Sequence, residues 1–202
     1  MYNNKVGGII YMSKKSSKNT TTMALNIVSA VLAVFVIVAF FCMPVFTRTT
    51  TLLDSKSVTN VTSMDLSSVG FRSDEDVTKS ITQDVIDGKD TAAKSLAFNI
   101  RENENSSFAF GLTLVMSYVA LLFAVLTLVF SVLSLFTKTG KINMIFGIGL
   151  AVSLIVVFVG GLIMAGAIGE GLLTKYSVGV GAIISMIVGV GACVTTSLAT
   201  KK

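Results

Sequence analysis

The sequence predicts an all-α membrane protein, a four-transmembrane-helix bundle with a small α+β extracytoplasmic segment between its first and second helices. The chain of 202 residues is 52% hydrophobic and only 13% charged, whereas soluble domains average about 25% charged residues. Four long stretches contain no Asp, Glu, Lys or Arg, and the segment between the first two carries all the acidic residues except Glu170. These observations together indicate membrane-spanning helices joined by one sizeable polar segment.

A membrane-spanning helix needs about 20 consecutive, mostly apolar residues. Because the links between the last three spans are short, we expect the second and third helices to form a tight hairpin. The second and third spans are longer than a hydrocarbon core of about 30 Å requires, so they should tilt or project beyond the membrane. The four stretches are residues 23–46, 108–136, 142–168 and 178–198, and the short links are residues 137–141 and 169–177.

Lysines beside the spans predict the orientation of the chain, because cytoplasmic loops carry an excess of basic residues. Eight lysines and no acidic residue lie in the tail 1–22, the turn 137–141 and the end 199–202. These segments are therefore predicted to be cytoplasmic, and residues 47–107 and 169–177 to lie outside. We expect a multi-pass plasma-membrane protein with both termini in the cytoplasm.

The first span is expected to remain in the protein as an uncleaved signal anchor. Its apolar stretch is longer than the 7–15 residues usual in a signal peptide, and no site with small residues follows it. A second translation start is also suggested, because Met12 opens a stretch, Met-Ser-Lys-Lys-Ser-Ser-Lys, that resembles a natural bacterial beginning. Residues 1–11 are therefore a candidate for an over-extended start.

The polar segment 47–107 is expected to fold as short strands followed by helix. Residues 47–71 are rich in Thr, Ser and Val, whose β-branching and short alternations favour two or three strands. Ser73 suits a helix N-cap, and acids in the first turn suit the helix dipole. Apolar residues then recur every four positions from Val77, until Gly88 is expected to end the helix. A second helix is expected over 91–100, running on toward the second span.

The sequence lacks the residues that several kinds of catalytic or metal-binding site need. The chain has no histidine, which excludes His-ligated haem, His-containing zinc sites and His-based triads. Cys42 and Cys193 are predicted near opposite membrane faces, too far apart for a disulfide. The sequence has no phosphate-binding Walker A motif, and its spans have none of the ionisable residues usual in ion-coupled transporters. We therefore predict no enzyme, catalytic residue, metal or cofactor, and no small-molecule substrate is identifiable.

The remaining charged and polar residues favour solvated surfaces. The basic pI is explained by lysines that flank spans, so nucleic-acid binding is not predicted. Glu170 is expected to be a solvated turn carboxylate. Asn26 and Asn143 lie near the cytoplasmic boundary, where we expect their side chains to reach water.

The acidic residues of the outer segment are expected to form a solvated charged surface. The run Asp74-Glu75-Asp76 lacks the ligand spacing of an EF-hand. Asp84 and Asp87 are spaced to lie on one helical face. Together with Asp90 they are the candidate residues of a membrane enzyme that uses carboxylates at the outer face. This hypothesis is less favoured than the two given at the end of this section.

Small residues form the most distinctive pattern of the last two spans. In the fourth span a small residue recurs every four positions, and the third span has two pairs at this spacing. Such stripes let helix backbones approach closely in lipid. The stripe is predicted to pack helices, either within this bundle or against another copy or a partner subunit. Its members are Gly181, Ser185, Gly189, Cys193 and Ser197 in the fourth span, and Gly149, Ser153, Gly161 and Ala165 in the third.

The third and fourth spans also carry a motif resemblance. The matching residues are Lys141-Ile142, Gly147, Phe158 and Gly161-Leu162 in the third span, and Gly179, Gly181 and residues 189–193 in the fourth. With the order of one span, an outer loop of strands then helix, and three linked spans, the chain resembles the four-helix superfamily of claudins and peripheral-myelin-protein-like proteins. The resemblance implies lateral self-assembly or an accessory role beside another membrane protein. The loop lacks that family's tryptophans and cysteine pair, so no functional residue is carried over.

These observations favour a non-enzymatic multi-pass membrane protein that acts as a scaffold, self-assembling or accessory subunit through helix–helix contacts and its outer segment. The expected partners are the lipid bilayer and either another copy or another membrane protein. The alternative is a permease subunit of a larger export or ABC-type transport complex, in which one span, an outer domain and three more spans also occur. The turn 137–141 is too short for a substantial coupling helix, which disfavours this alternative.

Overall fold

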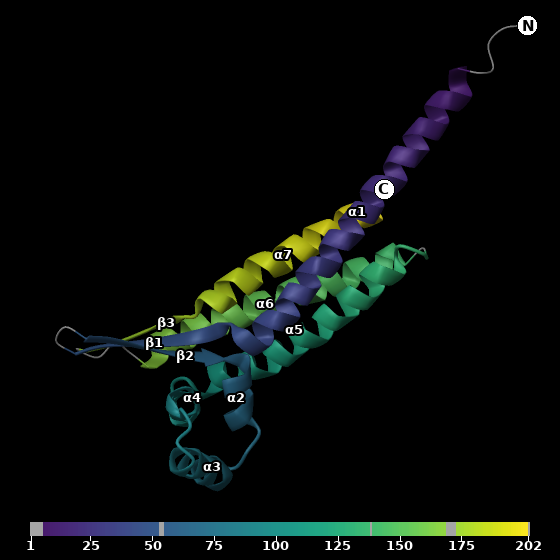
Figure 1. The fold of residues 1–202 in the computed structure, drawn as a ribbon. Coiled ribbons are helices and arrows are strands. Elements are labelled where there is room, and N and C mark those ends of the chain that lie inside the picture. The colour runs from purple at the N-terminus through teal and green to yellow at the C-terminus, as the bar shows by residue number, and fades with distance from the viewer. Residues whose placement is uncertain (1–5, 53–54, 138, 169–172, 202) are drawn as a thin grey trace, which may run out of the picture.

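The computed structural model describes residues 6–52, 55–137, 139–168 and 173–201, with residues 6–19 described by their backbone alone. Four of its helices contain stretches long and apolar enough to cross a membrane, and they pack side by side as a bundle (Figure 1). The predicted four-helix membrane-spanning fold is therefore confirmed. These helices are α1 (Val6–Cys42), α5 (Ser107–Leu133), α6 (Gly140–Ile168) and α7 (Val180–Thr200).

The ends of the helices differ from the predicted spans by a few residues. The sequence predicts a first span that runs to residue 46, but α1 ends at Cys42 and a strand begins at Pro44. Proline has no amide hydrogen for a helical bond and is tolerated as the first residue of a strand. At its other end α1 reaches back to Val6, so most of the predicted tail 1–22 is helical.

The segments outside the bundle form a small α+β unit at one end, which we call the cap domain (Figure 1). It comprises β1 (Pro44–Leu52), β2 (Ser55–Thr62), α2 (Ser63–Gly70), α3 (Asp74–Ile86), α4 (Ala92–Glu102) and β3 (Thr174–Val178). The opposite end of the bundle, where α7 ends, is called the terminal end below.

The sheet has the strand order β2-β1-β3, and both pairings are antiparallel. Arg48 of β1 lies opposite Thr59 on one side and Tyr176 on the other. The third strand comes from the link 169–177, which the sequence predicts to be a simple turn. That prediction is wrong for residues 174–177, because β1 supplies an unpaired edge to which this segment hydrogen-bonds.

The region 47–71, predicted to form two or three strands, forms two strands followed by a helix. Thr62 and Asp65 form a capping box at the start of α2: the Thr62 hydroxyl accepts from the Asp65 amide, and the Asp65 carboxylate accepts from the Thr62 amide at 2.8 Å. Such a box satisfies two amides that a new helix leaves free. The number of strands thus agrees with the prediction, and residues 63–70 form an additional helix that this local capping signal starts.

The next two helices follow the predicted signals closely. The Ser73 hydroxyl caps α3 by accepting from the Asp76 amide, and Gly88 follows the end of that helix with a φ of 72°. This left-handed conformation suits glycine. The helix predicted over 91–100 is α4, but it does not run on into the second span. It ends at Glu102, and a turn follows in which the Ser106 hydroxyl donates to the Ile100 carbonyl at 2.7 Å.

The cap and the bundle share one apolar core. Phe110 and Leu114 of α5 and Met164 of α6 belong to the same buried cluster as Phe46 of β1 and Leu66 of α2. The two longer helices therefore project into the cap, as their predicted length suggests. The cap is packed directly onto the bundle by this core.

Candidate functional site

The small residues of α7 face the interior of the bundle. Gly181, Ser185 and Gly189 are buried, whereas Cys193 and Ser197 are half-buried. A β-carbon at Gly181 would lie 2.6 Å from the Pro44 carbonyl oxygen, and one at Gly189 would lie 2.6 Å from a methyl group of Leu154. These glycines therefore let α7 approach the end of α1 and the face of α6.

The small residues of α6 are also used for contacts within the chain. A β-carbon at Gly149 would lie 2.8 Å from the ring of Phe123 on α5, and one at Gly161 would lie 3.5 Å from Val178. Ser153 is buried and donates to the Gly149 carbonyl at 2.7 Å, and Ala165 packs against the shared core. The stripe thus holds this bundle together, which leaves its buried members no surface to offer a partner.

A buried polar layer lies near the terminal end of the bundle. The amide of Asn143 donates to the Ser131 hydroxyl at 3.0 Å, and the hydroxyls of Ser29 and Thr195 lie 2.7 Å apart. These contacts join α5 to α6 and α1 to α7. Asn26, also in this region, is 2% exposed, and its carboxamide oxygen has no hydrogen-bond partner among the described residues.

The expectation that Asn26 and Asn143 reach water is wrong. Both side chains are almost fully buried, at 2% and 1% exposure. The sequence gives their depth along each helix but not the direction in which they face. Asn143 faces α5 and finds a hydroxyl there, which is the usual way to accommodate an amide inside a membrane bundle.

A cavity of about 30 Å³ lies at the cap end of the bundle, where all four long helices contribute to its wall. Its lining is mostly apolar but includes three serines, Ser63, Ser117 and Ser185. A cavity of this size with polar groups in its wall has room for ordered water. The Ser117 hydroxyl donates to the Thr113 carbonyl at 2.8 Å.

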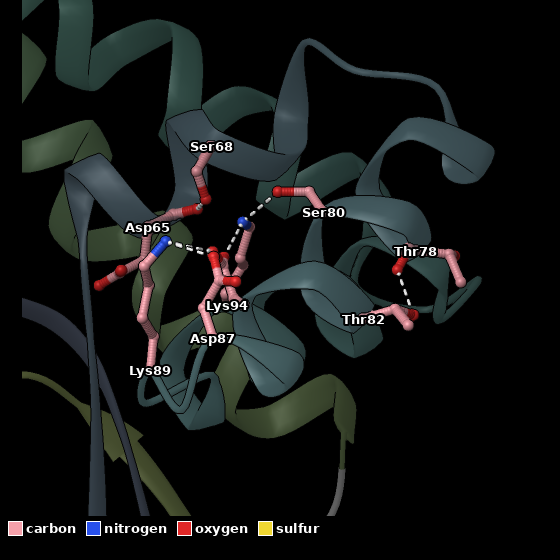
Figure 2. Close-up of polar contacts among 9 residues, drawn as sticks. Asp65, Ser68, Thr78, Ser80, Thr82, Asp87, Lys89 and Lys94 are labelled. Carbon is pink, nitrogen blue, oxygen red and sulfur yellow. Dashed lines mark hydrogen bonds and ion pairs between the residues drawn. The ribbon is translucent and has the colours of Figure 1, made fainter.

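The carboxylates considered for an enzyme site are engaged in a charged network between α3 and α4. Asp84 accepts from Lys94 at 2.7 Å and from Lys89 at 3.3 Å, and Lys89 also donates to Asp87 at 3.1 Å. Figure 2 shows Lys89 directed at Asp87, and Lys94 beside Ser80. Asp90 instead caps the start of α4 by accepting from the Ala92 amide. Asp84 and Asp87 thus share a face, as predicted, and Lys89 bridges the two carboxylates.

These contacts shift the pKa values of three groups. Hydrogen bonds from Lys94 and then Lys89 lower the pKa of Asp84, and hydrogen bonds from Gln83 and then Lys89 lower the pKa of Asp87. Hydrogen bonds to Asp87 and Asp84 raise the pKa of Lys89. All three shifts favour the charged forms. They describe a stabilised ion network rather than a carboxyl held protonated for acid catalysis.

The acidic run at the start of α3 is also paired. Asp74 binds Arg101, Glu75 binds Lys79 at 2.6 Å, and the Ser73 hydroxyl donates to Asp76. Within the described ranges, no cluster of three or more His, Cys, Asp or Glu residues is placed to hold a metal ion. Glu170 lies outside the described residues.

Several parts of the cap domain expose apolar side chains, and two of them are the far end of α3 and the turn that precedes this helix. The predicted apolar face of α3 begins at Val77, which is buried, but its far end is open: Val85 is 59% and Ile86 is 72% exposed. In Figure 1, α3 is the cap helix farthest from the bundle. The second part is the turn between α2 and α3, where Phe71 is 65% exposed.

That turn is fixed by Arg101, a residue to which sequence reasoning assigned no role. One nitrogen of its guanidinium donates to the carbonyl oxygens of Val69, at 2.6 Å, and Arg72, at 2.9 Å. Another nitrogen binds the Asp74 carboxylate. The side chain of Arg101 is only 14% exposed. Neither composition nor periodicity signals such a contact, since its partners lie 27 to 32 positions earlier in the chain.

Comparison with known proteins gives no relative for this arrangement: no protein-family model, no curated protein and no solved structure matches the chain.

Proposed function

We propose that this chain is a non-enzymatic, multi-pass membrane protein that serves as a scaffold or accessory subunit, with its cap domain as the contact surface for another membrane protein. The observation that carries the proposal is the open end of α3, where Val85 and Ile86 are 59% and 72% exposed. Exposed apolar residues beside charged ones are typical of protein contact sites. Lys89 and Asp87 supply the charged rim here.

The packing of the cap supports this role. A contact surface is effective when its backbone is ordered before binding, because less conformational entropy is then lost. The core shared by Leu66, Phe110 and Met164 fixes the cap on the bundle, and Lys94 ties α4 to α3 through Asp84 and Ser80. The small-residue stripe meanwhile packs the bundle itself, so the exposed end of α3 is favoured over the stripe as the partner surface.

Affinity purification of the tagged full-length protein from native membranes in mild detergent tests this function. We expect a stoichiometric partner that is lost in the double variant Val85→Ser with Ile86→Ser. The matched control is Val58→Ser on β2, which removes an exposed valine elsewhere on the cap and should retain the partner. A protein that stays monomeric in several detergents and in nanodiscs, or a partner retained equally by both variants, would refute the proposal.

A further inference from the structure

Phe71 occupies an unusual place for an exposed aromatic residue, because it lies against the flank of the bundle rather than on the solvent side of the cap. Its ring centroid is 5.6 Å from that of Tyr118 on α5. Tyr118 in turn makes an edge contact with Phe40 on α1 at 5.4 Å. Phe71 remains 65% exposed despite these neighbours, so most of its ring is free to contact something outside the chain.

The end of α1 gives the depth of this aromatic cluster in the bilayer. Phe40 lies in the last turn of α1, which ends at Cys42. The apolar stretch of α1, Thr20–Cys42, has 23 residues and is about 34 Å long at 1.5 Å per residue, close to a hydrocarbon core of about 30 Å. Its last turn therefore marks one edge of the hydrocarbon, and Phe71 lies at that level.

The surface of the bundle near Phe71 exposes further apolar side chains, as expected of a surface that faces lipid. Phe41 on α1 and Leu122 on α5 are 49% and 57% exposed, and Tyr118 on α5 is 38% exposed. Phe41 also contacts Phe40 at 5.1 Å between ring centroids. Phe71 thus extends a lipid-facing aromatic group rather than standing alone. Aromatic rings of this kind gather where hydrocarbon meets lipid headgroups.

Two contacts hold the turn in this place. Gly70 lies so close to α5 that a β-carbon there would be 2.1 Å from a methyl group of Leu114. Arg101 also binds the carbonyls of Val69 and Arg72. The exposed ring is therefore held by a fixed backbone.

The charge of the turn fits the same surroundings. Arg72 follows Phe71 and is exposed, and its side chain makes no hydrogen bond or ion pair within the part of the chain that the structure describes. The nearest acid along the chain, Asp74, is already bound by Arg101. A free guanidinium beside an aromatic ring can bind a lipid phosphate while the ring enters the interface.

We propose that Phe71 and Arg72 form a bilayer anchor, in which the Phe71 ring enters the lipid interface beside Tyr118 and Arg72 binds a phospholipid phosphate. This anchor would seat the helical side of the cap domain on the membrane surface. It goes beyond the proposed partner contact, which uses the far end of α3.

The absence of tryptophan from the sequence allows a direct test. Phe71→Trp in the full-length protein, reconstituted in phosphatidylcholine vesicles, gives a single fluorophore. We expect blue-shifted emission that is quenched by lipids brominated near the headgroup end of the chain and protected from aqueous iodide. Tyr118→Trp is the lipid-facing reference, and Ile86→Trp is the control on the same domain.

The possible outcomes distinguish lipid, water and protein as the surroundings of the Phe71 ring. Emission like that of Ile86→Trp, with iodide quenching, would mean that water surrounds Phe71 and would overturn the proposal. Blue-shifted emission without bromine quenching would mean that protein covers the ring, for example a second copy, and would also overturn it. Adding Arg101→Gln to Phe71→Trp should reduce the bromine quenching because the turn is released. A nitroxide at Phe71→Cys, with Cys42 and Cys193 replaced, gives a second measurement through its oxygen accessibility.

Discussion

Gly181 at the start of α7 lies directly against Pro44 at the start of β1: a β-carbon at position 181 would be 2.6 Å from the Pro44 carbonyl oxygen. The neighbouring Gly179 is also confined, because a β-carbon added there would lie 2.2 Å from the same oxygen. The chain leaving α1 and the chain entering α7 therefore cross with no room for side chains. This crossing sets the place where the bundle ends and the cap begins.

The crossing predicts the effect of the smallest substitution. Gly181→Ala is expected to destabilise the protein by about 1–3 kcal/mol, the usual cost of overpacking, because the Pro44 carbonyl belongs to a paired strand and cannot easily move. Thermal unfolding in detergent measures the effect. Gly111→Ala is the matched control, since a β-carbon there meets nothing within 4 Å, and alanine should stabilise α5 by about 0.5–1 kcal/mol. Equal behaviour of the two variants would contradict the packing described here.

The buried amides predict opposite results at two positions. A double-mutant cycle of Asn143→Ala and Ser131→Ala should give a coupling energy of about 0.6 kcal/mol, and at most about 1.7 kcal/mol, as for other hydrogen bonds within membrane bundles. Asn26→Leu should be neutral or stabilising, because it removes a buried oxygen without a partner. Unfolding by denaturing detergent in mixed micelles measures both. No coupling between positions 131 and 143 would argue against the polar layer.

The hydrogen bonds of Arg101 predict that this side chain stabilises the turn that carries Phe71. Arg101→Gln removes hydrogen bonds from a charged donor, each worth about 1.5–3 kcal/mol, and should expose the turn to chymotrypsin cleavage after Phe71. Limited proteolysis with mass spectrometry locates the cut. Lys79→Gln provides the control, because Lys79 pairs with Glu75 on the exposed surface of α3, outside the turn. Similar cleavage rates in both variants would show that Arg101 does not hold the turn.

The ion network predicts how the cap responds to pH. The folded pKa values of Asp84 and Asp87 are lowered, so their contribution is complete above the unfolded value of about 3.9 and is lost as the pH falls through the folded pKa. The pKa of Lys89 is raised, so its contribution is complete below about 10.4 and is lost as the pH rises through the folded pKa.

Unfolding free energies of α3 and α4, obtained from amide hydrogen exchange and corrected for the intrinsic rate, should therefore fall as the pH drops below about 3.9. Asp84→Asn should reduce this pH dependence. Glu104→Gln, which changes an exposed acid outside the network, should leave it unchanged. If Asp84→Asn does not alter the pH dependence of the unfolding free energies, Asp84 does not contribute to it.

Much of the fold is determined by signals that are local in the sequence. Each span is an uninterrupted apolar run, and in lipid a backbone satisfies its polar groups by forming a helix whatever its neighbours are. The caps of α3 are equally local, since the Ser73 hydroxyl reaches an amide three residues on and Gly88 adopts its conformation by itself. The stripe from Gly181 to Ser197 likewise indicates close packing before any partner is known.

Tertiary structure decided the features that depend on which segments meet. Residues 174–178 are a strand only because Thr50 and its neighbours in β1 offer a free edge more than 120 positions away along the chain. Asn143 is buried because its helix turns it toward Ser131, and Arg101 holds the Phe71 turn through carbonyls that any residue possesses. Strand pairing and backbone recognition leave little trace in residue type, because their energy comes from main-chain groups common to all residues.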